Sequence, residues 1–256
     1  MKKLVGLILA LALTLFSVAA FADTDYSVMT DDELEQIIQA AQAELDSRKA
    51  SSDAAAMESD GMVTIKEAGF EVAKGDALYY SFIAHSNLSD KAIKSPEFKI
   101  VVRDAEGGLI STKSQMLHIL YPGQDIMFGN YGMSVEGENP ASIEVEFVEP
   151  DQKWRTVDPS NTDYPGYQPI VVNSAKFKEA STSFQDNKIV GEFTNPNSFD
   201  IDQVAVTALF RDGDGKLLGG VTTYINGAKA GKATAFEIDF SQSLTADNYE
   251  VFIQPW

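Results

Sequence analysis

A strand pattern that occurs twice, 108 residues apart, constrains this sequence more than any other feature. Arg103-Asp104 in the first copy matches Arg211-Asp212 in the second, and Phe128 matches Phe236 at the same ungapped shift. The same shift relates Asn87 to Asn195, Gly107 to Gly215, Leu109 to Leu217 and Gly123 to Gly231. So many matches at one offset, with the apolar patterns in phase, indicate a duplication within the chain.

Both copies alternate apolar and polar residues, as half-buried strands do. The alternation runs through 98–102 in the first copy and 236–240 in the second. Asp212-Gly213-Asp214-Gly215 and Asn226-Gly227 are typical turn sequences between such runs. Short strands at regular spacing, joined by such turns, predict β-sandwiches or barrels.

Each copy has about the length of an immunoglobulin-like domain. We therefore predict an all-β fold of tandem immunoglobulin-like β-sandwiches, preceded by one amphipathic helix. The sandwiches are expected over 63–149 and 170–256, and the linker over 150–169 is rich in Pro, Asp, Tyr and Gly. Trp256, the last residue, is expected to pack under the last strand.

The second copy contains a strand, 188–195, that ends in Asn195, and a strand with an acidic turn over 204–216. With these motifs it resembles the FxLYD family of bacterial secreted immunoglobulin-like β-sandwich domains. The resemblance is strongest over 174–256 and weaker over 63–149. Arg211 and Arg103 stand where the family name has Tyr before Asp. The resemblance implies a sandwich in a secreted or surface protein, with no catalytic residues and no established ligand.

The N-terminus has the order of a secretory signal. Two lysines precede an apolar run over 4–18, and Ala20-Phe21-Ala22 fits a small-x-small cleavage site. We predict a signal peptide over 1–22, cleavage after Ala22 and a secreted, extracellular protein. The alternative is an uncleaved membrane anchor, since 4–22 approaches the ~20 residues that span a bilayer. No second long apolar segment follows, so we expect no membrane contact in the mature form.

A helix is predicted over 30–49, followed by a flexible tether over 50–62. Thr30 and Glu33 form a capping box at its start. One face carries the apolar residues Leu34, Ile37, Ile38, Ala41 and Leu45. Two interpretations stay open for this face. It packs on the following domain, or it docks on a partner helix and supports self-association.

Composition excludes several classes of function. The 38 acidic and 20 basic side chains give a formal net charge of −18, which argues against nucleic-acid binding. The absence of Cys excludes disulfide scaffolds, thiolate metal sites and a cysteine nucleophile. His85 and His118 are the only histidines, and neither lies in a catalytic motif. We therefore predict a non-enzyme with no catalytic residues and no cofactor, and keep a hydrolase of unknown type as a remote alternative.

Two groups of residues are weak candidates for binding. Asp212 and Asp214 could ligate calcium, but the following Lys216-Leu217 breaks a calcium loop, and a hairpin turn explains every residue. Trp154, Tyr164 and Tyr167 lie in the linker and could stack on sugar rings, or they could pack between the sandwiches.

The predicted function is an extracellular or cell-envelope binding or adaptor module, which acts without catalysis. Its partner would be an unknown protein or a cell-envelope glycan. The alternative is a glycan or cell-wall binding module that uses the linker aromatics.

Overall fold

The strands form where apolar residues occupy every second position, as in β4 (Glu97–Arg103) and β12 (Ile201–Arg211). The computed structural model describes residues 61–73, 77–242, 244 and 246–256. The predicted signal peptide, the helix with its apolar face, and all but the last two residues of the tether lie outside these residues. Within them the fold is all-β apart from two short 3-10 helices, as predicted. None of the described helices is long and apolar enough to cross a membrane.

The first repeat contains eight of the described strands. Besides β4 they are β1 (Val63–Ala73), β2 (Ala77–Ser86), β3 (Ala92–Lys94), β5 (Leu109–Met116), β6 (Ile119–Leu120), β7 (Asp125–Ser134) and β8 (Ser142–Val148). The linker contains η3 (Lys153–Arg155), β9 (Thr156–Val157) and η4 (Pro159–Asn161). The second repeat contains β10 (Val171–Lys178), β11 (Asn187–Thr194), β12, β13 (Leu217–Ala228), β14 (Ala233–Phe240) and β15 (Asn248–Pro255).

The same strand order occurs in both repeats. The first has antiparallel sheets β1-β2-β7 and β5-β4-β8, and the second has β10-β11-β14 and β13-β12-β15. β1, β5 and β7 begin 108 residues before their counterparts β10, β13 and β14. A small sheet of order β6-β3-β9 ties the linker to the first repeat. The structure thus repeats its strand order at the shift found in the sequence.

Each repeat has its own apolar core between its two sheets. In the first, Phe82, Phe98 and Phe128 are fully buried in one cluster. In the second, Phe193 and Ile238 are fully buried in another. These residues are on the inward faces that the alternation predicts.

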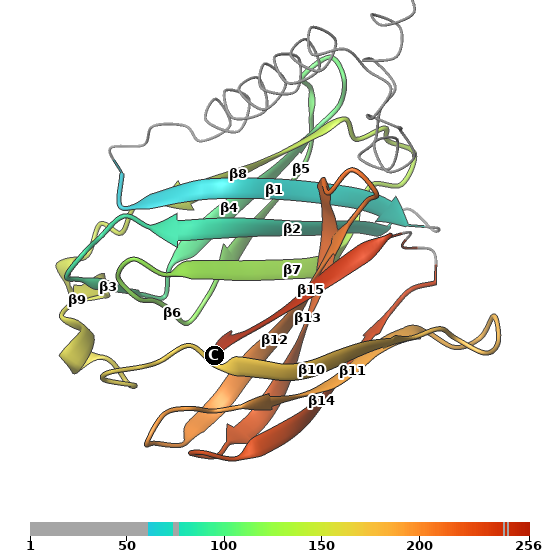
Figure 1. The fold of residues 1–256 in the computed structure, drawn as a ribbon. Coiled ribbons are helices and arrows are strands. Elements are labelled where there is room, and N and C mark those ends of the chain that lie inside the picture. The colour runs from blue at the N-terminus through green and yellow to red at the C-terminus, as the bar shows by residue number, and fades with distance from the viewer. Residues whose placement is uncertain (1–60, 74–76, 243, 245) are drawn as a thin grey trace, which may run out of the picture. The chain divides into compact units, whose positions relative to one another are not determined.

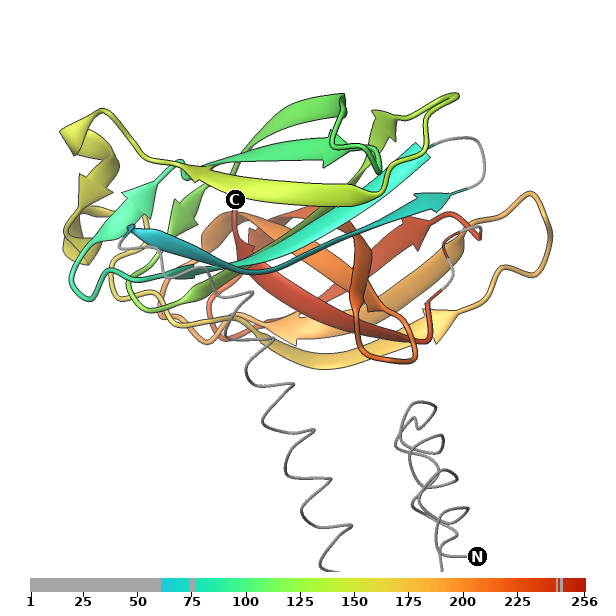
Figure 2. The ribbon, with the colours of Figure 1, turned by 90° about the horizontal axis from the view of Figure 1, so that it is seen from above.

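The outer faces of β1-β2-β7 and β13-β12-β15 pack on each other. Ile83 of β2, Leu209 of β12 and Leu217 of β13 form a third buried cluster there. The four large sheets are therefore stacked in the order β5-β4-β8, β1-β2-β7, β13-β12-β15, β10-β11-β14. Figure 1 shows this succession, and Figure 2 shows the cyan and green strands lying against the orange and red ones.

Glycines allow the two repeats to approach closely. A Cβ added at Gly69 would lie 1.9 Å from the carbonyl oxygen of Leu217, and one at Gly129 would lie 2.4 Å from Cα of Gly220. Since both obstacles are main-chain atoms, no side chain can move to make room. The repeats pack backbone against backbone, and the described residues of both belong to one compact unit. The linker does not separate two independent bodies.

An ion pair also joins the repeats. The Arg211 guanidinium donates to both carboxylate oxygens of Glu67, at 2.7 and 2.9 Å, and also to Glu250 of its own repeat. Hydrogen bonding to Glu67 raises the pKa of Arg211, so the side chain stays charged. Ser81 Oγ donates to the carbonyl of Leu218 at 3.1 Å. Polar contacts thus add to the glycine packing at this interface.

Candidate functional site

The three linker aromatics differ in exposure. Trp154 is 61% exposed, with the Arg155 guanidinium 5.9 Å from its ring centroid. Tyr164 and Tyr167 are buried: Tyr164 stacks on Phe199 and Tyr167 stacks on Tyr121. Of the two alternatives for these tyrosines, the structure agrees with packing and leaves their rings no free face for sugars. They pack the linker onto the body, and burial raises the pKa of Tyr167.

In the acidic turn after β12, the carboxylate of Asp212 forms hydrogen bonds with the backbone of the turn itself. Asp212 Oδ1 accepts hydrogen bonds from the backbone N–H groups of Asp214 and Lys216, at 3.1 and 2.8 Å. Gly215 has φ 82°, which L side chains rarely adopt. The first repeat has the same arrangement, with Asp104 Oδ1 accepting from Gly108 N–H at 2.6 Å. Among the described residues, no group of three His, Cys, Asp or Glu side chains is placed to hold a metal ion.

Asp212→Ala should lower the free energy of unfolding by about 1 kcal/mol, because two backbone N–H groups lose a charged acceptor at a solvent-exposed turn. Asp214→Ala should change it by less than about 0.5 kcal/mol, because the Asp214 side chain makes no contact in the turn. Urea unfolding measures both. Addition of Ca²⁺ should leave the midpoints unchanged, and a calcium-dependent rise that Asp212→Ala abolishes would establish a calcium site instead.

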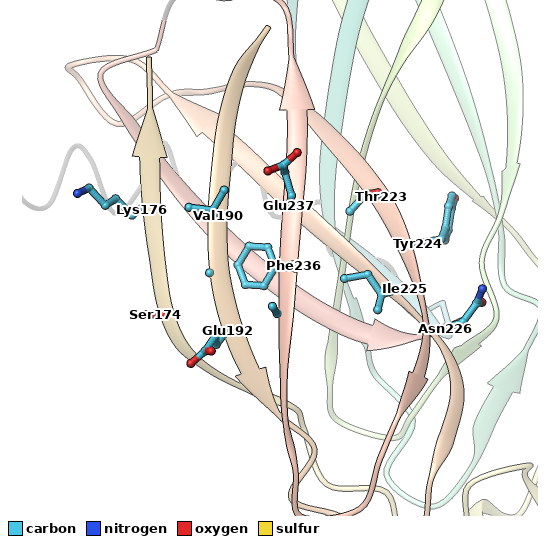
Figure 3. A pocket seen from close by; sticks show the side chains of 12 residues that line it. Ser174, Lys176, Val190, Glu192, Thr223, Tyr224, Ile225, Asn226, Phe236 and Glu237 are labelled. Atoms are coloured by element: carbon cyan, nitrogen blue, oxygen red, sulfur yellow. The ribbon is translucent and has the colours of Figure 1, made fainter. Parts of the chain in front are cut away.

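A cavity of about 960 Å³ lies in the second repeat, between the facing edges of β13 and β14. We call it the β13–β14 seam. It is lined by Ser174, Lys176, Val190, Gly191, Glu192, Thr223, Tyr224, Ile225, Asn226, Ala235, Phe236 and Glu237. Figure 3 shows the Phe236 ring between β11 and β14, and Thr223 and Ile225 on the side of β13 opposite to Tyr224 and Asn226.

Phe236 lines the seam but is almost fully buried in the core of the second repeat. Its ring occupies the space that a side chain on the neighbouring strand would need, because a Cβ at Gly191 would lie 2.6 Å from Phe236 Cζ. The exposed part of the lining includes charged side chains: Glu237 accepts from Lys188 at 2.6 Å, and Glu192 is exposed.

The walls of the seam are strand edges. β14 pairs only with β11, and over residues 222–226 β13 pairs only with β12. In the described part of the chain, no further main-chain hydrogen bond reaches 222–226 or 233–237. An edge strand leaves alternate N–H and C=O groups unpaired. The seam therefore offers hydrogen-bonding groups on both walls.

In the first repeat, the C-terminal residues Gln254 and Trp256 contact β7. Trp256 stacks on Phe128, with ring centroids 6.4 Å apart, and contacts Tyr224 at 4.7 Å. The Gln254 side-chain amide bonds both the N–H and the C=O of Met127 on β7. Trp256 thus packs across the first repeat, not under its own strand.

A second cavity, of about 270 Å³, lies between β7, the linker and β15. Asp125 lies in its wall, and its carboxylate accepts from Lys66 Nζ at 2.7 Å and contacts His85 Nδ1 at 2.6 Å. Burial opposes ionisation of Asp125, but the hydrogen bonds from Lys66 and His85 outweigh it and lower the pKa of Asp125. His85 therefore belongs to a polar cluster with Lys66 and Asp125. The sequence alone did not indicate that these three side chains lie together.

Asp125→Asn should destabilise the protein at pH 7 but not at acidic pH. A lowered folded-state pKa means that the carboxylate stabilises the fold above the ordinary value of 3.8. That contribution is lost as pH falls through the lowered pKa. Thermal unfolding from pH 7 to pH 2 measures the difference in stability between wild type and variant, which should narrow as pH falls below 3.8 and vanish below the lowered pKa of Asp125. A gap that persists at the lowest pH would contradict the assignment.

Comparisons with known proteins identify no family. No protein-family model and no curated protein matches the chain. Among solved structures, a β-glucuronidase of Bacteroides uniformis is similar over 65% of this chain and 21% of its own, at 12% identity and a TM-score of 0.24. The C-terminal globular domain of an oligosaccharyltransferase from Pyrococcus abyssi covers 75% of this chain and 46% of its own, at 8% identity and a TM-score of 0.14. The chain thus spans less than half of either protein, and neither likeness bears on its function.

Proposed function

We propose that this protein is an exported, non-enzymatic binding or adaptor module built from two immunoglobulin-like β-sandwiches. The observation that carries the proposal is the β13–β14 seam, a cavity of about 960 Å³ with charged and polar side chains in its lining and an open strand edge on each side. Such a surface recognises a partner by shape and hydrogen bonds. The two facing three-stranded sheets in each repeat support the immunoglobulin-like assignment.

The packing between the repeats supports an adaptor role. Glycine-to-backbone contacts and the Glu67–Arg211 ion pair hold the two repeats in one relative orientation. Surfaces on the two repeats therefore keep a constant spacing, so a partner that touches both meets a preorganised surface.

Export is proposed from the signal sequence over 1–22. The mature protein would begin at Asp23 and reach the cell envelope or the medium. N-terminal sequencing of the protein recovered from the medium or envelope of its host should give Asp-Thr-Asp as the first residues. An N-terminus at Met1 in a membrane fraction would instead establish an uncleaved anchor.

A second candidate, binding of a cell-envelope glycan, has one observation in its favour. Trp154 presents an exposed ring next to Arg155, a combination that suits stacking on a sugar. Tyr164 and Tyr167 take no part in this candidate, since their rings are buried.

Three parallel assays of the exported protein test the proposed function. A random peptide display library should give peptides that bind saturably. On a glycan array, wild type should give signals no stronger than those of Trp154→Ala. A panel of chromogenic ester and glycoside substrates should show no turnover. Glycan binding that Trp154→Ala removes would replace the proposal by the second candidate. Turnover, or a library without binders, would contradict it.

A further inference from the structure

We propose that this protein assembles head to tail with copies of itself, the exposed ring of Phe184 in one copy entering an apolar cavity of the next. The cavity is the one of about 270 Å³ between β7, the linker and β15, which we call the β7–β15 pocket. This assembly does not involve the β13–β14 seam, so it is independent of the proposed binding function.

Phe184 lies in the loop over 179–186, which joins β10 to β11 and which we call the Phe184 loop. Its side chain is 98% exposed, more than any other large apolar side chain that the structure describes. Transfer of such a ring from water into an apolar pocket is favourable. A single buried aromatic side chain can supply much of the free energy of a small interface.

Hydrogen bonds fix the loop that presents this ring. Gln185 N–H donates to the carbonyl of Thr182 at 3.2 Å, which closes a turn with Phe184 at its tip. The Gln242 side-chain amide donates to the carbonyl of Thr182 at 2.7 Å and to that of Gln185. Ser181 Oγ donates to Gln185 Oε1 at 2.7 Å. A loop held in this way loses little conformational entropy when its tip enters a binding site.

The β7–β15 pocket has the size and the walls that a phenyl ring needs. An engineered apolar cavity of about 150 Å³ takes up benzene, so about 270 Å³ holds the ring together with its methylene group. The walls include Ile126 and Met127 of β7, Val172 of β10 and Phe252 of β15. The Gln254 side-chain amide bonds both the N–H and the C=O of Met127 and so fixes one wall on another.

The electrostatics of the pocket also allow a ring to enter. Among the described residues that line it, only Asp125 is charged. The carboxylate of Asp125 accepts from Lys66 Nζ at 2.7 Å and contacts His85 Nδ1 at 2.6 Å. An entering ring therefore leaves no unpaired charge behind it, which is the costly case for apolar burial.

The ring and the pocket lie at opposite ends of β10. Val172, in the pocket wall, is the second residue of this strand, and the Phe184 loop follows its last residue, Lys178. The steps from Val172 to Lys178 alone span roughly 20 Å. Figure 1 shows the C-terminus beside the start of β10 and the connection to β11 at its far end. Phe184 therefore cannot fill the pocket of its own chain, and a contact between two different surfaces repeats from copy to copy.

Two substitutions separate the two sides of the contact. Phe184→Ala removes the ring and leaves the pocket, whereas Val172→Trp fills the pocket and leaves the ring. Gln124→Trp fills the pocket from another wall and repeats the test with a different change in the core. Ser183→Ala, next to the ring, and Val171→Trp, at a side chain that is 53% exposed, are matched controls. Sedimentation velocity of the exported protein measures the size of the assemblies over a range of concentrations, and circular dichroism shows that each variant is folded.

Wild type and both controls should form larger assemblies as the concentration rises. Phe184→Ala and Val172→Trp should each need at least about a tenfold higher concentration for the same degree of association, because burial of the ring is lost. An equimolar mixture of these two variants should form pairs that grow no further. One partner of each pair still offers a ring and the other still offers a pocket.

Three results would overturn the proposal. The first is a wild type that does not associate at any concentration. The second is a Phe184→Ala protein, or a pair of folded pocket variants, that associates as readily as wild type, since the contact would then lie on another surface. The third is an equimolar mixture that associates no more than its components.

Discussion

Replacing Gly129 by alanine is expected to lower the free energy of unfolding by about 3 kcal/mol. The added Cβ would lie 2.4 Å from Cα of Gly220, and main-chain atoms on both sides leave nothing that can rotate away. The two repeats must then move apart, which also loosens the Glu67–Arg211 ion pair. Urea unfolding measures the loss of stability, and small-angle X-ray scattering measures the expected increase in the radius of gyration.

Gly213→Ala is the matched control for this experiment. Its Cβ would meet Asp247 Oδ2 at 3.4 Å, an ordinary contact distance. Neither Gly129 nor Gly213 has a positive φ, so alanine causes no backbone strain at either position. The difference between the two variants therefore reports the interface alone. Equal stability of the two would show that the repeats are not packed backbone against backbone.

Trp256→Ala should lower the free energy of unfolding by about 2 kcal/mol, because it removes the ring that packs on Phe128 and Tyr224. The estimate lies below the usual value for a buried tryptophan, since Trp256 is only partly buried. Urea unfolding gives the change in stability. The near-UV circular dichroism of the aromatic cluster should weaken in parallel.

Trp154→Ala provides the same substitution at an exposed site. Trp154 is 61% exposed, so its loss should change stability by less than about 0.5 kcal/mol. A Trp256→Ala protein as stable as Trp154→Ala would mean that the C-terminus does not pack on the first repeat.

The sequence predicted the all-β class, the strand phases and the role of the acidic turn. Alternation at 98–102 and 236–240 identified inward faces that are indeed buried. The 108-residue match of Asp104 with Asp212 indicated a structural turn in both repeats, and both carboxylates cap their turns. Strand alternation and turn capping depend on residues close together in the sequence, so they can be predicted from the sequence pattern at those positions.

The packing of one repeat on the other could not be derived in the same way. It depends on glycines such as Gly69 and Gly220 that meet residues far away in the chain. One signal was present: residues 78–84 of β2 form a nearly continuous apolar run, which is typical of a strand buried on both faces. The burial of Tyr164 and the position of Trp256 on the first repeat depend on the same packing. The periodicity of the sequence carries no information about how one repeat packs on the other.

Amide hydrogen exchange along β7 and β14, followed by NMR, tests the central claim most directly: the C-terminus covers the edge of β7, and the edge of the equivalent strand β14 is open. The Met127 amide, which donates to Gln254, should be protected although it lies at a sheet edge. Alternate amides of β14 over 233–237 should exchange rapidly, because no group pairs with that edge. Uniform protection along β14, or rapid exchange at Met127, would contradict the account.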